Sequence, residues 1–408
     1  MTVVLEPGDL DLRRFIRPGD RVLVAEGAGE PQTLTEALIE QRQALGGVEV
    51  FLGLTLGTAF APDRVDGLTL RSYGALGQIR RLADAGLLDI TPVALGDVPA
   101  LLEKGALTFD VVLTSAAAAR DGGYPLSLMA LHVPAALRHA RTVIVEVNAR
   151  LPQTPGVSVE AARVAAVVHS DRAPLITPAG EPDPVTRAIA ANVAGVIENG
   201  ATLQLGVGAM ADAVCRELRG HKDLGVHSGM LNDGLVDLMR RGVITNRRKA
   251  QFQGVSMVSA VLGSQDAYDF VHQNPQVRLE GVEMIHQLAG REPGMVSING
   301  ALEVDVWGQI NAETVGGRYI GAIGGQPQFC RAGTRAPNGA AIIALPSTAA
   351  GGKVSRIRSA PVERVTTGAA DVDIVVTEYG VARLSGIGFA DRRKALAAIA
   401  HPDFRDTF

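Results

Sequence analysis

Two glycine-rich turns in the sequence have the backbone needed to bind a developing negative charge. They are Gly206-Val207-Gly208, which follows an apolar run, and Gly324-Gly325-Gln326, which leads into a predicted helix. Because glycine has no side chain, the main-chain N–H groups of such turns can donate hydrogen bonds to an oxyanion. Glycine turns after strands are also common in α/β proteins without such a role, so both interpretations stay open at this point.

Few other residues have the type and position to take part in chemistry. His227 lies two residues before Gly229, so an extended segment would point both to one face. Its imidazole suits general base catalysis near pH 7, and packing in the core is the alternative role. Lys353 and Arg356, in the loop GGKVSRI, could bind phosphate or form a solvated basic loop. Asn299 could orient a ligand or hold a loop.

The bulk composition narrows the class of partner and compartment. The formal net charge of −4 gives no general attraction to nucleic acid. Cys215 and Cys330 are the two cysteines and form no CxxC pair, which argues against a disulfide framework or a zinc site and favours a reducing compartment. The first twelve residues do not read as a signal peptide, and no apolar run is long enough for a bilayer. We therefore expect a cytoplasmic protein with no metal and no membrane partner.

Short apolar runs alternate with amphipathic stretches along the whole chain. This alternation predicts an α/β fold with parallel strands covered by helices on both faces. The predicted strands cover residues 21–25, 48–53, 109–114, 142–147, 202–205, 255–262, 340–345 and 372–377. The predicted helices cover residues 33–45, 98–104, 127–140, 186–197, 211–218, 235–240 and 389–399.

A chain of 408 residues is too long for one compact core, so two domains are expected. Residues 173–183 are rich in proline and read as a linker. A strand, a glycine turn and a helix occur on both sides of it, as VLVAEGAGEPQTLTEAL and LQLGVGAMADAVCREL. We predict two related open α/β domains, residues 1–183 and 184–408, although any two α/β units share part of this pattern.

Long motifs of the second half resemble the acetyl-CoA hydrolase/transferase family, which includes 4-hydroxybutyrate CoA-transferases. The motifs are GVGAMADAVCRELRGHKDLGVHSGMLNDGLVDLMRRGVITNRRK, MVSINGALEVDVWGQINAE, IGGQPQFCRAG, ALPSTAAGGKVSRI, VTEYGVARL and IAHPDFRD. Looser matches in the first half extend the resemblance over nearly the whole chain. The resemblance implies a class I CoA-transferase fold with its active site in the cleft between the domains. It also implies acyl-CoA and a small carboxylic acid as ligands, no cofactor beyond coenzyme A, and a homo-oligomer.

One position departs from the family pattern. Enzymes of this family have a nucleophilic glutamate between the residues that correspond to Ser228 and Met230, where this sequence has Gly229. The resemblance implies that the carboxylate attacks the acyl-CoA carbonyl, and that returning CoA thiolate then forms a glutamyl-CoA thioester. Glycine offers no carboxylate, so this intermediate cannot form at residue 229.

We therefore expect a reaction on a CoA thioester without glutamyl-CoA, such as hydrolysis or a lyase reaction. Gly229, His227, Gly324 and Gly325 form the expected catalytic region, with the two glycine amides at the oxyanion. The expected coenzyme A contacts are Gly206, Val207, Gly208, Gln326, Asn299, Lys353 and Arg356. Two alternatives stay open: a CoA-transferase that uses another carboxylate, and a catalytically silent CoA-binding subunit.

Three further residues have expected structural roles. Asp233 precedes a predicted helix and is expected to cap its N-terminus. Glu303 corresponds to a family glutamate that is not the nucleophile, so a structural role is favoured. Cys330 follows the second glycine turn on a predicted helix and is expected to be a buried small residue.

Overall fold

The computed structural model describes residues 2–178 and 180–408, and its internal contacts divide the chain into two compact units. Unit 1 consists of Met1–Thr177, Ser259–Met284 and Tyr319–Gly324. Unit 2 consists of Pro178–Val258, Ile285–Arg318 and Gly325–Phe408. The sequence predicts one boundary, at 183/184. The first division in the structure lies at 177/178, and two short later segments join unit 1 through contacts that composition does not encode.

The sheet of unit 1 is parallel, as its buried apolar runs predicted. Its strands, in spatial order, are β1 (Val3–Leu5), β10 (Ala166–Ser170), β8 (Thr142–Asn148), β6 (Val111–Ala116), β2 (Arg21–Val24), β3 (Glu49–Leu52), β4 (Thr69–Ser72) and β5 (Asp89–Ile90). Each neighbouring pair runs parallel. Every residue of β6 and β8 is buried, so helices and loops cover both faces at the centre of the sheet.

The sheet of unit 2 has a matching order. Its strands are β13 (Ser256–Val258), β12 (Gly225–Ser228), β11 (Thr202–Leu205), β15 (Met295–Gly300), β20 (Ala340–Ala344), β24 (Ile374–Thr377) and β25 (Gly380–Arg383). Within this set β25 is antiparallel to its neighbour and the other pairs are parallel. In unit 1 the central strand β2 has β3, β4 and β5 on one side and β6 on the other, and in unit 2 the central strand β11 has β12 and β13 on one side and β15 on the other. This shared order supports the prediction of two related domains.

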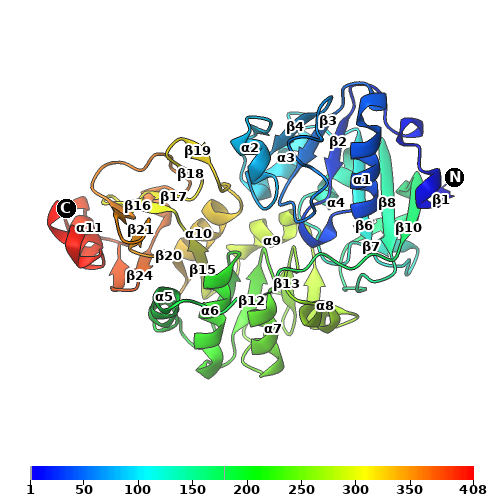
Figure 1. Cartoon of the computed structure of the whole chain (residues 1–408). Helices are drawn as coiled ribbons and strands as arrows, with labels where there is room; N and C mark the ends of the chain where they lie inside the picture. The colour runs from blue at the N-terminus through cyan, green and yellow to red at the C-terminus, as the bar shows by residue number, and fades with distance from the viewer. Residues whose placement is uncertain (1, 179) are drawn as a thin grey trace. The chain divides into compact units, whose positions relative to one another are not determined.

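Helices flank both sheets (Figure 1). Unit 1 contains α1 (Gln32–Gln41), α2 (Arg80–Asp84), α3 (Val98–Glu103), α4 (Val133–His139) and α8 (Gln265–Val271). Unit 2 contains α5 (Pro184–Ala194), α6 (Ala209–Glu217), α7 (Asp233–Arg240), α10 (Gln326–Arg335) and α11 (Phe389–Ala398), and α9 (Val282–Ala289) begins in unit 1 and ends in unit 2. The helices α5, α6 and α7 form one layer, while α9 and α10 share a hydrophobic cluster with β13 and β15.

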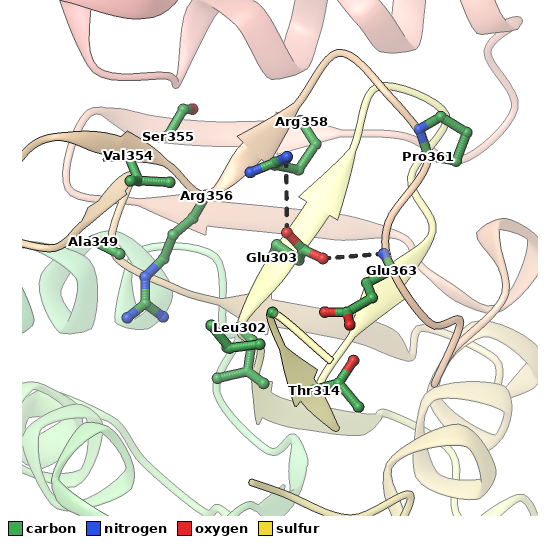
Figure 2. A pocket seen from close by; sticks show the side chains of 12 residues that line it. Leu302, Glu303, Thr314, Ala349, Val354, Ser355, Arg356, Arg358, Pro361 and Glu363 are labelled. Carbon is green, nitrogen blue, oxygen red and sulfur yellow. Dashed lines mark hydrogen bonds and ion pairs between the residues drawn. The ribbon is translucent and has the colours of Figure 1, made fainter. Parts of the chain in front are cut away.

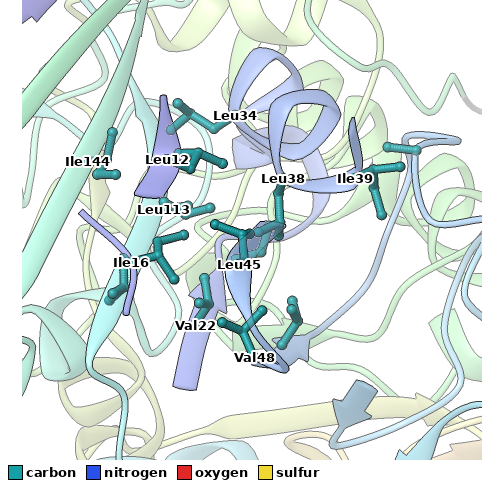
Figure 3. Packing of buried hydrophobic residues seen from close by; sticks show 14 of the residues in the cluster. Leu12, Ile16, Val22, Leu34, Leu38, Ile39, Leu45, Val48, Leu113 and Ile144 are labelled. Atoms are coloured by element: carbon teal, nitrogen blue, oxygen red, sulfur yellow. The ribbon is translucent and has the colours of Figure 1, made fainter. Parts of the chain in front are cut away.

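The core of unit 1 shows why α1 forms where it does. Leu34, Leu38 and Ile39 recur at helical spacing and are completely buried. Figure 3 shows them beside the strand residues Val22 and Leu113, which belong to the same cluster. Full burial of each such side chain stabilises the fold by about 1.5–3 kcal/mol.

Most predicted elements are confirmed within a few residues, but two are shortened. The predicted helix 127–140 begins only at Val133, because Ser127 and Leu131 have positive φ angles and Pro134 occupies the first turn. The predicted strand 255–262 is reduced to β13. The capping prediction for Asp233 is wrong: the Asn232 side chain accepts from the Leu235 N–H at 3.0 Å, so Asn232 caps α7.

The described residues contain neither a membrane-spanning helix nor a cluster of metal ligands. None of the helices there combines the length and apolar character that crossing a bilayer requires. Among the same residues, no group of three or more His, Cys, Asp or Glu side chains is arranged to hold a metal ion.

Candidate active site

In unit 2 the strand order changes direction at β11, so the carboxyl ends of the parallel strands β11 and β15 form a topological switch point. The chain passes from β11 to β12 on one side, and β15 later pairs with β11 on the other. The register pairs Leu205 with Ile298, so Gly206 follows one strand opposite Asn299 near the end of the other. Open α/β sheets bind ligands at such a topological switch point. The predicted contacts Gly206, Gly208 and Asn299 therefore belong to one locality.

The loop between β11 and α6 exposes part of its backbone. The Gly206 N–H donates to the Ile298 carbonyl at 2.9 Å, so this amide is already used. The N–H groups of Val207 and Gly208 donate to no described residue, and the Val207 side chain is 63% exposed. Gly208 has φ +102°, a conformation that favours glycine, and it directly precedes α6. The loop thus offers amide donors and a helix N-terminus to an anion.

The side chain of Asn299 is hydrogen-bonded to Gln204 of the neighbouring strand β11. Its Nδ2 donates to Gln204 Oε1 at 2.9 Å, and Gln204 Nε2 donates back to Asn299 Oδ1 at 3.2 Å. Both side chains are buried. The reciprocal pair joins β11 to β15 near their carboxyl ends, so Asn299 helps to fix these two strands beside each other.

Gly229 directly follows β12, and the space beside it has room for a Cβ atom. The preceding Ser228 is fully buried, and its Oγ accepts from the Leu205 and Met230 N–H groups, each at 3.2 Å. A Cβ atom built on Gly229 would have one neighbour within 4 Å, the Phe329 Cε2 atom at 3.7 Å, and its φ lies outside the left-handed region. Neither crowding nor backbone conformation therefore requires glycine at residue 229.

His227 is fully buried on β12. Its Nε2 donates to the Ile285 carbonyl at 2.7 Å, because a carbonyl oxygen can only accept, and Nδ1 has no hydrogen-bond partner among the described residues. Burial, together with the nearby Lys249 ammonium, lowers the pKa of His227 to about 4. The ring is therefore neutral at pH 7, with its proton on Nε2.

The second glycine turn leads into α10. Gly324 has φ +59°, and its carbonyl accepts from the Leu95 N–H at 2.9 Å within unit 1. Gly325 is the N-cap residue of α10, and its own N–H donates to no described residue. Of the two amides expected at an oxyanion, the Gly325 amide thus stands at a helix N-terminus, where the helix dipole favours negative charge.

Gln326 joins the start of α10 to the end of β15. Its Nε2 donates to the Gly300 carbonyl at 2.7 Å, and its Oε1 accepts from the Thr367 hydroxyl at 2.9 Å. The side chain is buried, and both of its polar ends have partners. These bonds make Gln326 a positioning residue for the glycine turn.

The sequence reasoning missed His286, which lies in the same region. A Cβ atom on Gly325 would lie 2.4 Å from His286 Cε1, and the His286 ring lies 4.5 Å from the Phe329 ring, centroid to centroid. His286 Nδ1 lies 2.9 Å from Gln328 Oε1, and burial lowers the pKa of His286 to about 4. The sequence did contain a signal for this residue. His286 is the one polar residue on an otherwise apolar face of its helix.

Substitution by alanine should change the free energy of unfolding much more at Gly325 than at Gly229, although both glycines lie beside Phe329. Gly325→Ala places a methyl group against the His286 ring, so we expect a loss of about 1–3 kcal/mol in the free energy of unfolding. Gly229→Ala makes only an ordinary contact and should change that free energy by about 0.5 kcal/mol or less. Urea unfolding of both variants measures the difference, and equal losses would contradict the described packing.

Arg356 and Lys353 do not share an environment. Lys353 is exposed near the tip of the hairpin formed by β21 (Thr348–Ala349) and β22 (Val354–Ser355). Arg356 is half-buried, and its Nη1 donates to the Ala301 carbonyl at 3.3 Å. It lines a pocket of about 450 Å³ within unit 2 (Figure 2). Gln326 and Arg356 thus each donate to a carbonyl at the end of β15, Gly300 or Ala301, whereas Lys353 has no such bond among the described residues.

Comparison with known proteins decides the family. The family model described as the acetyl-CoA hydrolase/transferase N-terminal domain matches residues 10–177, and the model of the C-terminal domain matches residues 263–408. The chain is 36% identical over 398 residues to a 4-hydroxybutyrate coenzyme A transferase of Clostridium kluyveri, covering 95% of this chain and 92% of that protein. The chain belongs to the acetyl-CoA hydrolase/transferase family. It is an enzyme of that family, whose members act on coenzyme A thioesters.

Solved structures of similar proteins agree with this family assignment. RipA from Yersinia pestis has a TM-score of 0.92 at 30% identity, covering 99% of this chain and 96% of that chain. A 4-hydroxybutyrate CoA-transferase from Porphyromonas gingivalis has a TM-score of 0.82 at 31% identity, again over 99% and 96%. The predicted two-domain α/β fold of CoA-transferase type is thereby confirmed.

Proposed function

We propose that this chain converts an acyl-CoA without a glutamyl-CoA intermediate, by hydrolysis or by a lyase reaction such as decarboxylation. The observation that carries the proposal is the absence of a side chain at Gly229, at a position where a Cβ atom would make only an ordinary contact. Without a carboxylate at this position the covalent route through residue 229 is removed, while the surrounding backbone donors stay available.

Both reactions need the same stabilisation of negative charge. In hydrolysis, water adds to the thioester carbonyl, the C–S bond breaks, and CoA thiolate takes up the proton that the water loses. In decarboxylation, a C–C bond breaks, CO₂ leaves, and the resulting enolate is protonated on carbon. In each case charge develops on the thioester oxygen, and the amides of Val207, Gly208 and Gly325 are the proposed donors.

The buried imidazoles of His227 and His286 are poorly suited to act as general bases in either reaction. The pKa values of His227 and His286 are both lowered to about 4, so each would be a weak proton acceptor at pH 7. We assign His227 a packing role, since its Nε2 proton is held by Ile285. The proposed catalysis depends mainly on oxyanion stabilisation and on binding of the coenzyme.

Transfer of CoA between carboxylic acids is the second candidate. It is favoured by the name of the Clostridium kluyveri relative, a coenzyme A transferase that matches over almost the whole chain. This alternative needs a nucleophilic carboxylate from a residue other than 229.

A substrate panel separates these functions. The pure protein is incubated with acyl-CoAs that include malonyl-type and glutaconyl-type thioesters, with and without acetate, and products are identified by mass spectrometry. We expect free CoA or a decarboxylated thioester at a rate that acetate does not change. Acetyl-CoA formed only with acetate would favour the transferase, and CoA binding without turnover would favour a silent subunit.

A further inference from the structure

His286 of α9 contacts the first turn of α10 at three points. Its imidazole lies directly against Gly325, so closely that a Cβ atom there would collide with the ring. Its Nδ1 lies 2.9 Å from Gln328 Oε1, and its ring lies 4.5 Å from the Phe329 ring, centroid to centroid. All four residues belong to unit 2. One side chain thus contacts this turn through a hydrogen bond, a ring contact and close packing on its first residue.

The same turn carries one of the amides that the proposed function uses. The Gly325 N–H donates to no described residue, and the Gly325 carbonyl accepts from the Phe329 N–H at 3.1 Å, the first hydrogen bond of α10. Cβ atoms built on Gly325 and Gly229 would lie 3.1 and 3.7 Å from the same atom, Phe329 Cε2. A small rotation of this turn would therefore redirect the Gly325 amide beside residue 229.

The His286 ring is neutral, and its proton faces the turn. An amide oxygen can only accept, so the proton is on Nδ1 and is donated to Gln328 Oε1. Burial lowers the pKa of His286 to about 4, so the ring carries no charge at pH 7. A neutral ring can lie beside the positive end of the α10 dipole without repulsion.

Packing alone does not require a histidine at residue 286. Helices α9 and α10 already contribute buried apolar side chains to one hydrophobic cluster, namely Ile285, Ala289, Phe329, Ala332 and Ala336. A leucine would extend this cluster, whereas burying an imidazole costs free energy that one hydrogen bond only partly offsets. Local choices that cost stability in this way are expected chiefly at functional sites.

We propose that His286 is a positioning residue, which fixes the first turn of α10 so that the Gly325 N–H stays directed at the thioester oxygen. The inference rests on the proposed function, in which this amide stabilises the developing charge. An oxyanion donor acts through its placement, and a displacement of about 1 Å can cost about 100-fold in rate. In this role His286 takes up no proton, so its loss should lower kcat without weakening the binding of CoA.

The test uses two substitutions of His286 and one of a histidine outside the site. His286→Leu removes the ring and its proton but retains apolar volume, and His286→Asn retains an N–H donor close to the place of Nδ1. His221→Leu is the control, because His221 Nε2 lies 3.0 Å from the Ile197 carbonyl and His221 precedes β12, at the amino end of the strands. Circular dichroism establishes that each variant is folded.

The kinetic readout separates positioning from binding. The constants kcat and KM are measured with the thioester of the substrate panel that wild type converts fastest, and calorimetry measures the affinity for free CoA. We expect His286→Leu to lower kcat by about 10-fold or more, with KM and the affinity for CoA within about 3-fold of wild type. His286→Asn should recover kcat to within about 3-fold of wild type, and His221→Leu should stay in that range.

Two kinetic results would overturn the assignment. One is a folded His286→Leu protein with the kcat of wild type. The other is a loss confined to KM and to the affinity for CoA, which would make His286 a ligand contact.

Hydrogen exchange tests the positioning without turnover. The Phe329 amide reports on the first hydrogen bond of α10, and it should exchange about 10-fold faster in His286→Leu than in wild type or His221→Leu. If wild type converts no thioester, the proposed function fails, and this measurement still tests whether His286 fixes the turn. Equal exchange in all three proteins would show that it does not.

Discussion

Gly229→Glu should give this chain the CoA-transferase activity that we propose the wild type lacks. The new carboxylate would stand directly after β12, where the family resemblance implies a nucleophile, and could form the mixed anhydride and then glutamyl-CoA. We expect acetate-dependent exchange of CoA at a rate on the order of 100-fold or more above wild type, since removal of a covalent nucleophile from other enzymes costs at least this much. Mass spectrometry of acetyl-CoA formed from a second acyl-CoA measures it.

The structure makes this gain feasible and supplies its control. The first side-chain atom at residue 229 meets only Phe329, at 3.7 Å, so the variant should fold. Gly229→Gln adds almost the same volume without a carboxylate and should show the wild-type rate of exchange. A folded Gly229→Glu protein with no exchange would mean that the surrounding pocket, rather than the missing nucleophile, prevents transfer.

Glu26→Gln should stabilise the protein increasingly as the pH rises. Glu26 is buried at the carboxyl end of β2, where burial raises its pKa to about 7. A carboxyl whose pKa is higher in the folded than in the unfolded state contributes stability below about pH 4.5 and loses it as the pH rises through about 7. A shift of this size corresponds to roughly 3 kcal/mol in the free energy of unfolding at pH 8. Glutamine has no such charge to bury.

The contacts of Glu26 show why glutamine should be accepted. Glu26 Oε2 accepts from the Tyr73 hydroxyl and the Leu54 N–H, each at 2.5 Å, whereas Oε1 has no hydrogen-bond partner among the described residues. Oε1 lies 3.7 Å from His132 Nδ1, which is likewise unpaired in that set. A glutamine amide could accept on the first side and direct an N–H towards the imidazole on the second.

Urea unfolding between pH 4 and pH 8 measures this effect. The difference between Glu26→Gln and wild type should be nearly constant below pH 4.5 and should grow in favour of the variant up to about pH 8. Glu40→Gln, on the exposed side of α1, should change the free energy of unfolding by about 0.5 kcal/mol or less. A Glu26→Gln protein that is less stable than wild type by the same amount at every pH would contradict a buried neutral carboxyl.

Most strands and helices could be predicted because they depend on local pattern. The apolar runs that became β2, β8 and β11 are short, flanked by turns and buried, which is typical of parallel strands. The segment before Val133 misled the prediction because its amphipathic pattern continues, while positive φ angles at Ser127 and Leu131 break the helix. Those angles depend on tertiary contacts that a pattern does not contain.

The candidate site was predictable in its backbone and less so in its side chains. The glycine turns could be found from sequence because clustered glycines stand out between an apolar run and an amphipathic stretch. Three side chains of the site are positioned by residues far along the chain: Gln326, Asn299 and His286. Their hydrogen bonds and ring contacts therefore could not be predicted from sequence spacing. The partial burial of Arg356 is a property of three-dimensional packing, and the sequence shows only a basic loop.

The central claim is that this enzyme never carries CoA covalently. Intact-protein mass spectrometry after incubation with an acyl-CoA, with borohydride or hydroxylamine used to trap thioesters and anhydrides, tests it most directly. Gly229→Glu serves as the positive control for adduct formation. We predict that the wild-type mass stays unchanged while the acyl-CoA is consumed. A trapped adduct on any acidic residue of the wild-type chain would contradict the claim.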